Sequence, residues 1–234
     1  MQKLSIIIPV YNERKTIASI LDAVARCSVS GLEKEIIIVD DGSTDGTTEF
    51  LKTLVGVPMY QIVSMAKNCG KGAAVRKGFA QASGDFILIQ DADLEYDPQD
   101  YERVLAPLLA GQADVVFGSR FVGGRPHRVM FFWHYAGNRF LTTISNIFTN
   151  LNLSDMEACY KAFTKKAVQQ LSPLLKANSF DIEPELVSRA AQRSLRIDEV
   201  GIAYSGRTYA EGKKIKWRDG FAALWTIVRC AIMR

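Results

Sequence analysis

The alternation of short apolar runs with segments of helical periodicity is the feature that most constrains the fold of this chain. Apolar runs at 4–10, 35–40, 60–64, 86–91 and 114–120 are predicted strands. Between them, apolar residues recur three and four positions apart; the segment 13–25, with Asn12 as its expected N-cap, carries Ile17, Ile20, Leu21 and Val24. Strands that alternate with helices of this size predict right-handed βαβ units and a mainly parallel sheet covered by helices on both faces.

The sequence after residue 124 departs from this regular alternation. A basic loop precedes an aromatic-rich predicted helix at 131–151, and a strand and a helix are expected within 154–171. A further helix at 184–193, a strand at 195–204, a basic glycine-punctuated stretch at 205–220 and a helix at 221–233 follow. No internal repeat or separate second core is visible, so we expect one α/β domain.

Composition narrows the class of protein. The 234 residues are 48% hydrophobic and 23% charged, as in ordinary globular proteins, and a net charge of +4 is too small to indicate nucleic acid as a partner. Four scattered cysteines favour reduced thiols in a cytoplasmic protein, and two histidines are too few for a histidine-rich zinc site. The sequence shows neither a signal peptide nor a long apolar run, so we expect no membrane-spanning segment.

Polar sequences follow four of the predicted strands: VYNE, DDGSTD, QDAD and GSR. The carboxyl ends of parallel strands lie at one edge of a sheet, where open α/β proteins bind ligands. Strands also end in polar loops for structural reasons alone. Two of these sequences are dense in carboxylates, however, which favours a ligand site.

Asp91 and Asp93 are two residues apart, so in a continuing strand their side chains would share one face. Neighbouring carboxylates repel one another unless a cation neutralises them, and oxygen ligands of this kind suit Mg²⁺ or Mn²⁺. An acidic turn in water is the alternative. In DDGSTD, we assign ligand contact to Asp41 and helix capping to Ser43 or Asp45.

Nucleotide-binding motifs of two other classes are absent. GKGAAV at 70–75 lacks the third glycine of a dinucleotide-binding loop, and no P-loop sequence occurs, so neither a dehydrogenase nor a P-loop enzyme is expected. Lys71, at a predicted helix start, is a candidate anion contact. The basic residues that are candidates for binding phosphate are Arg120, Arg125, Arg128, Arg139, Arg207, Lys213 and Lys214. Arg207 is the strongest, because the glycine-containing stretch around it could close over a diphosphate.

Seven motifs occur together and in order: IIIPVYNE, IIIVDDGSTDGT, GKGAAVRKGF, QDADLEYDP, VVFGSRF, SDMEACYKAF and GRTYAEGKK. With them the chain resembles family 2 glycosyltransferases of the GT-A fold, from about residue 3 to the last helix. The subgroup it most resembles comprises the dolichyl-phosphate mannose synthases and related bacterial polyprenyl-phosphate glycosyltransferases. The resemblance implies a GT-A catalytic domain at 1–216, with a nucleotide-sugar half at about 1–120 and an acceptor half with a basic lid loop at 121–216. The remaining segment, 217–234, would be a C-terminal amphipathic helix.

The same resemblance implies roles for individual residues. The nucleoside of a GDP- or UDP-linked sugar would be held by Pro9, Tyr11, Glu13, Val39 and Asp41. Asp91, Ala92 and Asp93 would be the D-x-D motif that holds Mg²⁺ or Mn²⁺ on the diphosphate, with Glu95, often glutamine in relatives, as a third metal ligand. Phosphates would be bound by Arg120, Arg139, Arg207 and Lys213. Asp155 occupies the place of a catalytic base, so the implied catalytic set is Asp93, Asp155 and Arg207.

Transfer with inversion would place the nucleophile opposite a leaving diphosphate whose growing charge the metal and cations stabilise. A polyprenyl phosphate is already largely ionised at neutral pH, so it needs no strong base, and Asp155 would then orient groups instead of accepting a proton. Two alternatives stay open: a saccharide or other hydroxyl acceptor, which needs a base, and a non-catalytic sugar-nucleotide-binding module. The Q-x-x-R-W motif and membrane helices of other family branches are missing, as in the peripherally attached type.

The predicted last helix offers a means of reaching a lipid acceptor. Its apolar stripe consists of Phe221, Leu224, Trp225, Val228 and Ile232, with Arg218, Arg229 and Arg234 around it. Such a helix can lie in a membrane interface, at the cytoplasmic face or beside a membrane-anchored partner protein, or it can pack on the catalytic core. Phe131, Phe132 and Trp133 form a second candidate membrane contact with the same core alternative.

Overall fold

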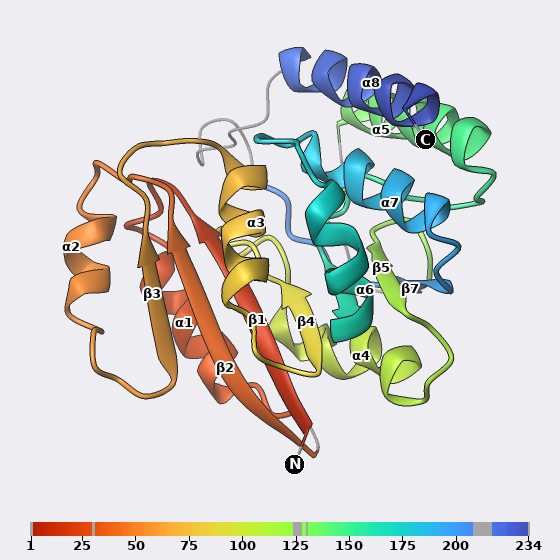
Figure 1. Cartoon of the computed structure of the whole chain (residues 1–234). Coiled ribbons are helices and arrows are strands. Elements are labelled where there is room, and N and C mark those ends of the chain that lie inside the picture. Colours follow the sequence, from red (N-terminus) through yellow and green to blue (C-terminus); the bar gives the residue numbers. More distant parts are fainter. Residues whose placement is uncertain (1, 30, 124–127, 130, 208–216, 234) are drawn as a thin grey trace.

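A seven-stranded sheet is the centre of the molecule. The computed structural model describes residues 2–29, 31–123, 128–129, 131–207 and 217–233, and within them helices cover both faces of the sheet (Figure 1). The strands are β1 (Gln2–Val10), β2 (Leu32–Asp40), β3 (Tyr60–Ser64), β4 (Phe86–Ile89), β5 (Val115–Ser119), β6 (Lys161–Thr164) and β7 (Ile197–Gly201). Their order across the sheet is β3-β2-β1-β4-β6-β5-β7. The predicted α/β architecture with a mainly parallel sheet is therefore confirmed.

Strand β6 is the exception to the parallel arrangement. It pairs antiparallel with β4 on one side and with β5 on the other, whereas β1, β2, β3 and β4 are parallel to one another, as are β5 and β7. An antiparallel strand begins where its neighbours end. The residues that precede β6 consequently lie at the carboxyl end of β4 and β5.

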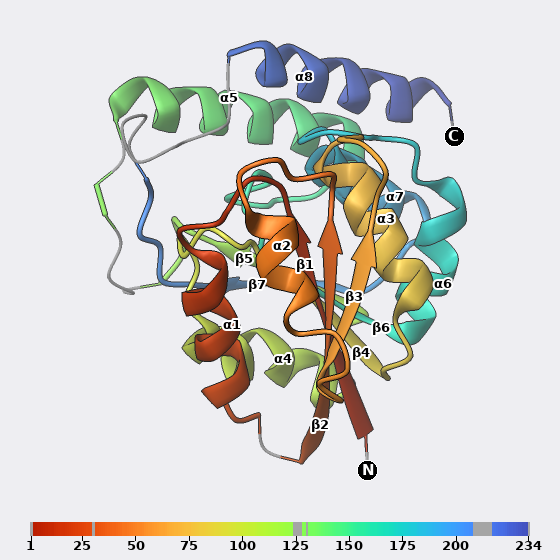
Figure 2. The same cartoon turned by 90° about the vertical axis from the view of Figure 1, so that its left-hand side faces the viewer.

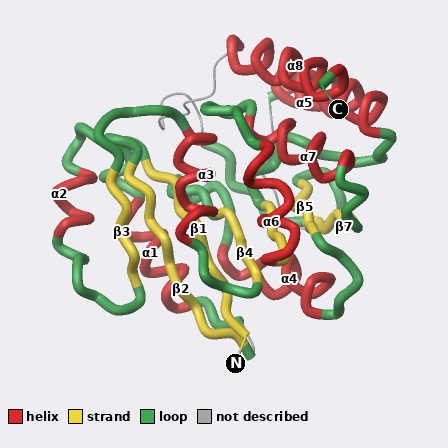
Figure 3. The backbone as a smooth tube through the Cα atoms, in the orientation of Figure 1, coloured by secondary structure: helices red, strands yellow, loops and turns green. Residues whose placement is uncertain are grey.

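The helices form a layer on each face of the sheet, as Figure 3 shows in the same view. One hydrophobic core contains buried residues of α1 (Ile17–Arg26), α2 (Thr47–Lys52) and α4 (Tyr101–Leu109). The other contains those of α3 (Lys71–Gln81), α6 (Lys165–Leu171) and α7 (Ile182–Gln192). Two short 3-10 helices, η1 (Pro98–Asp100) and η2 (Ser172–Leu174), adjoin α4 and α6.

Two longer helices lie side by side beyond the carboxyl ends of β1, β2 and β3, as the turned view shows (Figure 2). They are α5 (Phe132–Thr149) and α8 (Trp217–Ile232). Helix α8 packs inward through Ala223, Thr226, Ile227 and Cys230, all buried. The predicted stripe faces the other way: Phe221, Trp225 and Ile232 are 65%, 67% and 78% exposed, while Leu224 and Val228 are partly buried at its margin. For those three exposed residues the core-packing alternative is therefore wrong.

The N-cap assigned to Asn12 is also wrong. Helix α1 begins at Ile17 with Thr16 at the N-cap position, so Asn12 precedes it by more than a turn. The Asn12 side-chain oxygen instead accepts a hydrogen bond from the Thr44 N–H at 2.7 Å, and the backbone N–H of Asn12 donates to the Ser43 hydroxyl. The residue joins the loops after β1 and β2, which is a tertiary contact that local sequence does not reveal. None of the described helices has the length and hydropathy needed to cross a bilayer.

Candidate active site

The carboxyl edge of the sheet brings together groups that are far apart in the sequence. Ile89, the last residue of β4, pairs with Lys161, the first residue of β6. The QDAD segment after β4 therefore lies beside 154–160, the segment that leads into β6. Arg120, which directly follows β5, reaches the same place through its contact with Asp155.

Asp91 belongs to a buried ionic chain, which we call the sealed network. Lys71 Nζ lies 2.8 Å from Asp91 Oδ1 and 3.0 Å from Glu183 Oε1, and Lys161 Nζ lies 2.6 Å from Glu183 Oε2. The side chains of Lys161 and Glu183 are 1% and 2% exposed. Although burial acts to lower it, the charges of Asp91 and Glu183 raise the pKa of Lys71 well above its ordinary value. Lys71 therefore neutralises the acids instead of offering itself to a ligand anion.

A second group of acids, which we call the open cluster, surrounds Arg207. The Arg207 guanidinium lies 3.1 Å from Glu13 Oε1, 3.1 Å from Asp93 Oδ2 and 3.7 Å from Glu95 Oε1. The backbone N–H of Arg207 also donates to Glu95 at 2.7 Å. Burial, followed by the charges of Asp91 and Glu95, raises the pKa of Asp93 to about 7, against the effect of Arg207. The arginine therefore leaves part of the negative charge uncompensated.

The donor set suits a hard divalent cation. Asp91, Asp93 and Glu95 supply carboxylate oxygens at the end of one strand, and such oxygens are the ligands that Mg²⁺ and Mn²⁺ prefer. In the part of the chain that the structure describes, no group of three or more acids, cysteines or histidines is already arranged to hold a metal. Lys71 and Arg207 now occupy carboxylate oxygens on Asp91 and Asp93. Metal binding would require at least Arg207 to give up its contact with Asp93.

Asp155 is engaged as a partner of Arg120. Arg120 Nε and Nη2 donate to the two carboxylate oxygens of Asp155 at 2.7 and 2.8 Å. The backbone N–H of Arg120 also donates to Asp155 Oδ2, at 3.0 Å. The side chain of Asp155 is fully buried and that of Arg120 is 8% exposed. A carboxylate held in this way is poorly placed to accept a proton from a substrate. Arg139 lies apart from this pair: it is exposed on α5, with Nη1 3.4 Å from the Ser154 carbonyl.

The expected nucleoside residues lie at the ends of β1 and β2. Pro9 and Val39 are buried and paired across these strands, and Tyr11 is partly buried after β1. Both carboxylate oxygens of Asp41 accept backbone N–H groups, from Cys69 and Gly70 at 2.7 Å each. Asp41 thus holds the turn before α3, a structural role beside the expected ligand contact.

Three further outcomes concern the predicted residues. Asp45 accepts the N–H of Thr47, the first residue of α2, although Gly46 occupies the N-cap position itself. Ala92 is buried between the two aspartates. Arg125, Lys213 and Lys214 lie outside the described residues, as does most of the expected lid loop.

Sequence reasoning did not identify Glu183, Lys161 or Glu157 as parts of this edge. Lys161 and Glu183 lie in a strand and a helix whose apolar pattern carries no mark of an ion pair. The one available signal is the charged residues within the otherwise apolar SDMEACYKAF segment, because a buried charge requires a partner.

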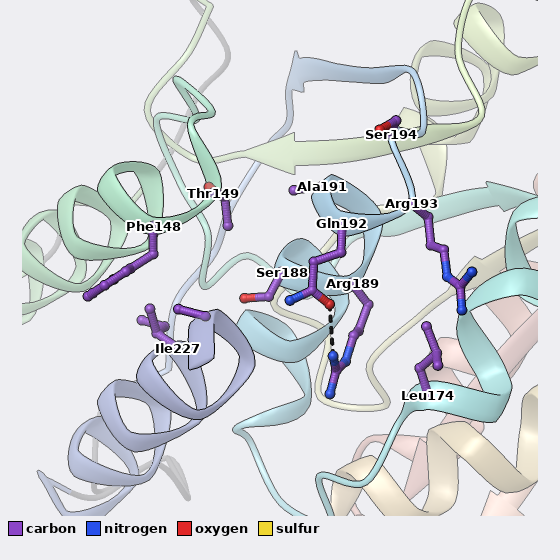
Figure 4. Close-up of a pocket in the computed structure, with 11 residues that line it drawn as sticks. Phe148, Thr149, Leu174, Ser188, Arg189, Ala191, Gln192, Arg193, Ser194 and Ile227 are labelled. Carbon is purple, nitrogen blue, oxygen red and sulfur yellow. Dashed lines mark hydrogen bonds between the residues drawn. The ribbon is translucent and has the colours of Figure 1, made fainter. Parts of the chain in front are cut away.

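The cavity drawn in Figure 4 is separate from this edge. It has a volume of about 510 Å³ and lies where α5, α7 and α8 meet, lined among others by Phe148, Ser188, Arg189, Gln192 and Ile227. None of the acids of the sealed network or the open cluster lines it. We therefore take the carboxyl edge, and not this cavity, as the candidate active site.

Comparison with known proteins identifies the family of the chain and its fold. The family model described as "Glycosyl transferase family 2" matches residues 5–172. Undecaprenyl-phosphate 4-deoxy-4-formamido-L-arabinose transferases of Proteus mirabilis and Yersinia pestis are 26% and 28% identical over 216 residues. Each match covers 91% of this chain and 63% of the relative, so the chain spans less than two thirds of these proteins.

Solved structures with a similar fold include glucosyl-3-phosphoglycerate synthase from Mycobacterium tuberculosis. Its complex with phosphoglyceric acid has a TM-score of 0.75 and 19% identity, covering 98% of this chain and 80% of that chain. Its complex with Mn²⁺, uridine diphosphate and phosphoglyceric acid has a TM-score of 0.74 and 21% identity, covering 98% and 78%. With the family model spanning most of its length, the chain belongs to glycosyl transferase family 2 and has the GT-A fold that its motifs led us to expect.

Proposed function

We propose that the chain is an inverting glycosyltransferase that moves a sugar from a nucleotide-diphosphate sugar to a polyprenyl phosphate. The observation that carries this proposal is the open cluster, in which Glu13, Asp93 and Glu95 share one arginine at the carboxyl end of β4. Acids so placed suit a cation that binds a diphosphate. The relatives named as undecaprenyl-phosphate transferases support the lipid acceptor.

The sheet edge suggests how a donor would lie. The nucleoside would contact Pro9, Tyr11 and Val39 at β1 and β2, with Asp41 nearby, and the diphosphate would lie at β4. A divalent metal held by Asp91 and Asp93, with Glu95 beside them, would stabilise the charge of the leaving diphosphate. Arg207, once released from Asp93, would bind a phosphate oxygen. We extend the phosphate contacts to Arg120, Arg139 and Lys213, with residues 1–120 as the donor half and 121–216 as the acceptor half.

The pairing of Asp155 with Arg120 favours a phosphate acceptor over a hydroxyl. A hydroxyl acceptor needs a base, whereas the Asp155 carboxylate already receives three hydrogen bonds from Arg120. An ionised lipid phosphate needs none. In this proposal Asp155 orients Arg120, and the arginine and the metal supply the electrostatic stabilisation.

Transfer of radiolabel to lipid tests the reaction. Purified protein is incubated with undecaprenyl or dolichyl phosphate and with each of a panel of UDP- and GDP-linked sugars, with Mn²⁺, with Mg²⁺ or with excess chelator. We expect label in the lipid phase with at least one donor, and its loss on chelation. In a parallel reaction that offers a soluble saccharide as acceptor, label in that saccharide and none in the lipid would support a hydroxyl acceptor. Binding of donor without turnover would support a non-catalytic module.

We further propose that the protein binds the membrane surface through α5 and α8. The exposed apolar side chains that we call the aromatic platform are Phe132, Trp133, Phe140 and Ile147 of α5 and Phe221, Trp225 and Ile232 of α8. The two helices lie side by side at the end of the molecule toward which β1, β2 and β3 point (Figure 2). Exposed Arg139 and Arg218 adjoin the platform in sequence, where they could meet lipid phosphates. Tryptophan prefers the depth of the head groups.

Vesicle sedimentation tests the platform. Trp133→Ser combined with Trp225→Ser should reduce the fraction bound to phosphatidylglycerol vesicles about tenfold. Val55→Ser, which changes an apolar side chain that is 69% exposed elsewhere, is the matched control and should change nothing. Equal vesicle binding by the double variant and the native protein would contradict the proposal. A native protein that is dimeric in solution, with a double variant that is monomeric, would assign the platform to a protein contact.

A further inference from the structure

The segment 154–160 is held at nearly every backbone position. Glu199 accepts the N–H groups of Ser154 and Asp155, the Thr142 hydroxyl accepts that of Met156, and the Tyr96 hydroxyl accepts that of Cys159. The buried Lys161 ammonium donates to the carbonyls of Met156 and Ala158. A loop fixed in this way holds its side chains in one position.

Glu157, in the middle of this loop, differs from its neighbours because its side chain has no hydrogen-bond partner among the described residues. Its Oε1 is fully buried, yet the residue as a whole is partly exposed. A buried carboxylate oxygen without a partner is costly, and a protein retains one where a ligand or a neighbouring charge compensates it. Arg120 and Lys161 provide part of that compensation through space.

The order of the strands indicates what Glu157 would meet. A nucleotide sugar is a linear molecule of nucleoside, diphosphate and sugar. In the proposed function its nucleoside lies at β2 and β1 and its diphosphate at β4. The next strand across the sheet is β6, and Glu157 lies four residues before β6 begins at Lys161. The sugar would therefore extend to the loop that carries Glu157.

We propose that Glu157 is a specificity-determining residue that accepts hydrogen bonds from hydroxyl groups of the donor sugar. The inference rests on the proposed function, because it uses the orientation of the donor along the sheet edge. A carboxylate accepts two such bonds and rejects a sugar that lacks a hydroxyl at that position, since the acceptor is then left unpaired. Burial, followed by the charge of Glu183, raises the pKa of Glu157 to about 7, with Arg120 and Lys161 opposing and Asp155 adding to the rise.

The competing explanation is that Glu157 only balances the charges of Arg120 and Lys161. Two substitutions separate the explanations. Glu157→Asp keeps the charge near Lys161 but withdraws the carboxylate by about one bond length from the sugar. Glu157→Gln keeps the length but removes the charge. A purely electrostatic role should tolerate the aspartate, whereas a sugar contact should not.

Calorimetric titration tests the proposal without an acceptor. Each protein is titrated, with Mn²⁺ present, with UDP, UDP-glucose, UDP-N-acetylglucosamine, GDP and GDP-mannose. For the donor that the native protein transfers, we expect both Glu157 variants to weaken the sugar nucleotide about tenfold or more and the matching nucleoside diphosphate less than about twofold. Glu49→Gln, an exposed change on α2, should leave all five dissociation constants unchanged.

The outcomes separate this inference from the proposed function. A Glu157→Asp variant with native affinity for the sugar nucleotide, or variants that weaken nucleoside diphosphate and sugar nucleotide equally, would overturn the sugar contact and leave the transfer proposal intact. A native protein that binds none of the five nucleotides would contradict both. Sugar nucleotides that each lack one sugar hydroxyl provide a further test. One of them should bind the native protein about tenfold more weakly than the complete sugar nucleotide does, and the two should bind Glu157→Ala equally.

Discussion

The sealed network and the open cluster are neighbours at one sheet edge, yet they differ in charge balance and exposure. In the sealed network, two lysines meet two acids, Asp91 and Glu183, and its inner pair is almost fully buried. In the open cluster, one arginine meets three acids, and the side chains of Arg207 and Asp93 are 15% and 17% exposed, which matches only the outer end of the sealed network at Asp91 (15%).

The difference in charge balance indicates different roles for the two groups. A balanced buried network is costly to break, so it fixes the position of Asp91 and of the loop before β6. An unbalanced, partly exposed cluster can exchange one cation for another at lower cost. We therefore expect changes in the sealed network to reduce stability and changes in the open cluster to reduce activity with little change in stability.

Removal of Lys161 should have the largest effect. Lys161→Met leaves Glu183 with one partner and two loop carbonyls with none, so the free energy of unfolding should fall by about 3–5 kcal/mol. Urea denaturation measures it. The double variant Lys161→Met/Glu183→Gln removes the stranded charge and should recover part of the loss. A fall of less than about 1 kcal/mol in the single variant would remove the distinction between the two clusters.

Removal of Arg207 should have the opposite profile. Arg207→Ala should reduce kcat about 100-fold, equivalent to about 2.7 kcal/mol, because a cation that stabilises the leaving diphosphate is lost. The melting temperature should change little, since three acids lose a partner that is only partly buried. Arg196→Ala, which removes an exposed arginine paired with Asp114, is the control and should affect neither quantity appreciably. A large loss of stability in Arg207→Ala would show that Arg207 stabilises the fold, as the lysines of the sealed network are expected to do.

Glu35, at the opposite end of the sheet, belongs to a third charged group, whose contribution to stability should depend on pH. Although burial opposes it, hydrogen bonds from Ser5, Lys3 and Ser83 lower the pKa of Glu35 to about 2. Because this pKa lies below the ordinary value, Glu35 stabilises the fold above about pH 4.5 and loses that contribution as pH falls toward 2. Glu35→Gln should therefore reduce the free energy of unfolding by about 1–2 kcal/mol at pH 7 and by less at pH 3. If the difference in free energy of unfolding between native protein and Glu35→Gln did not vary with pH, the charge of Glu35 would not contribute to stability.

Much of the fold and part of the site followed from the sequence because they depend on local patterns. The apolar runs of β1, β2 and β4 and the helical spacing in α1 place these elements, and the QDAD segment places its acids at a strand end. The direction of β6 does not follow from such patterns, because four residues that are mostly buried pair equally well in either direction. Its antiparallel course is what brings Asp155 and Glu157 to the edge.

The partners of the charged residues were likewise beyond local reasoning. Lys71 pairs with Asp91 and Glu183, which are 20 and 112 positions away, so neither contact leaves a periodic signal. The orientation of α8 was left open for a related reason: its two faces are both apolar, and the choice depends on α5 and α7, against which Ile227 and Cys230 pack.

Binding of Mn²⁺ measured by electron paramagnetic resonance, in the presence of UDP or GDP, tests the central claim most directly. The claim is that the acids after β4 capture a divalent cation once a diphosphate draws Arg207 away. We predict a saturable Mn²⁺ site in the native protein that requires the nucleotide and is lost in Asp93→Asn, with the fold unchanged. Mn²⁺ binding of equal strength in native protein and Asp93→Asn would contradict the account.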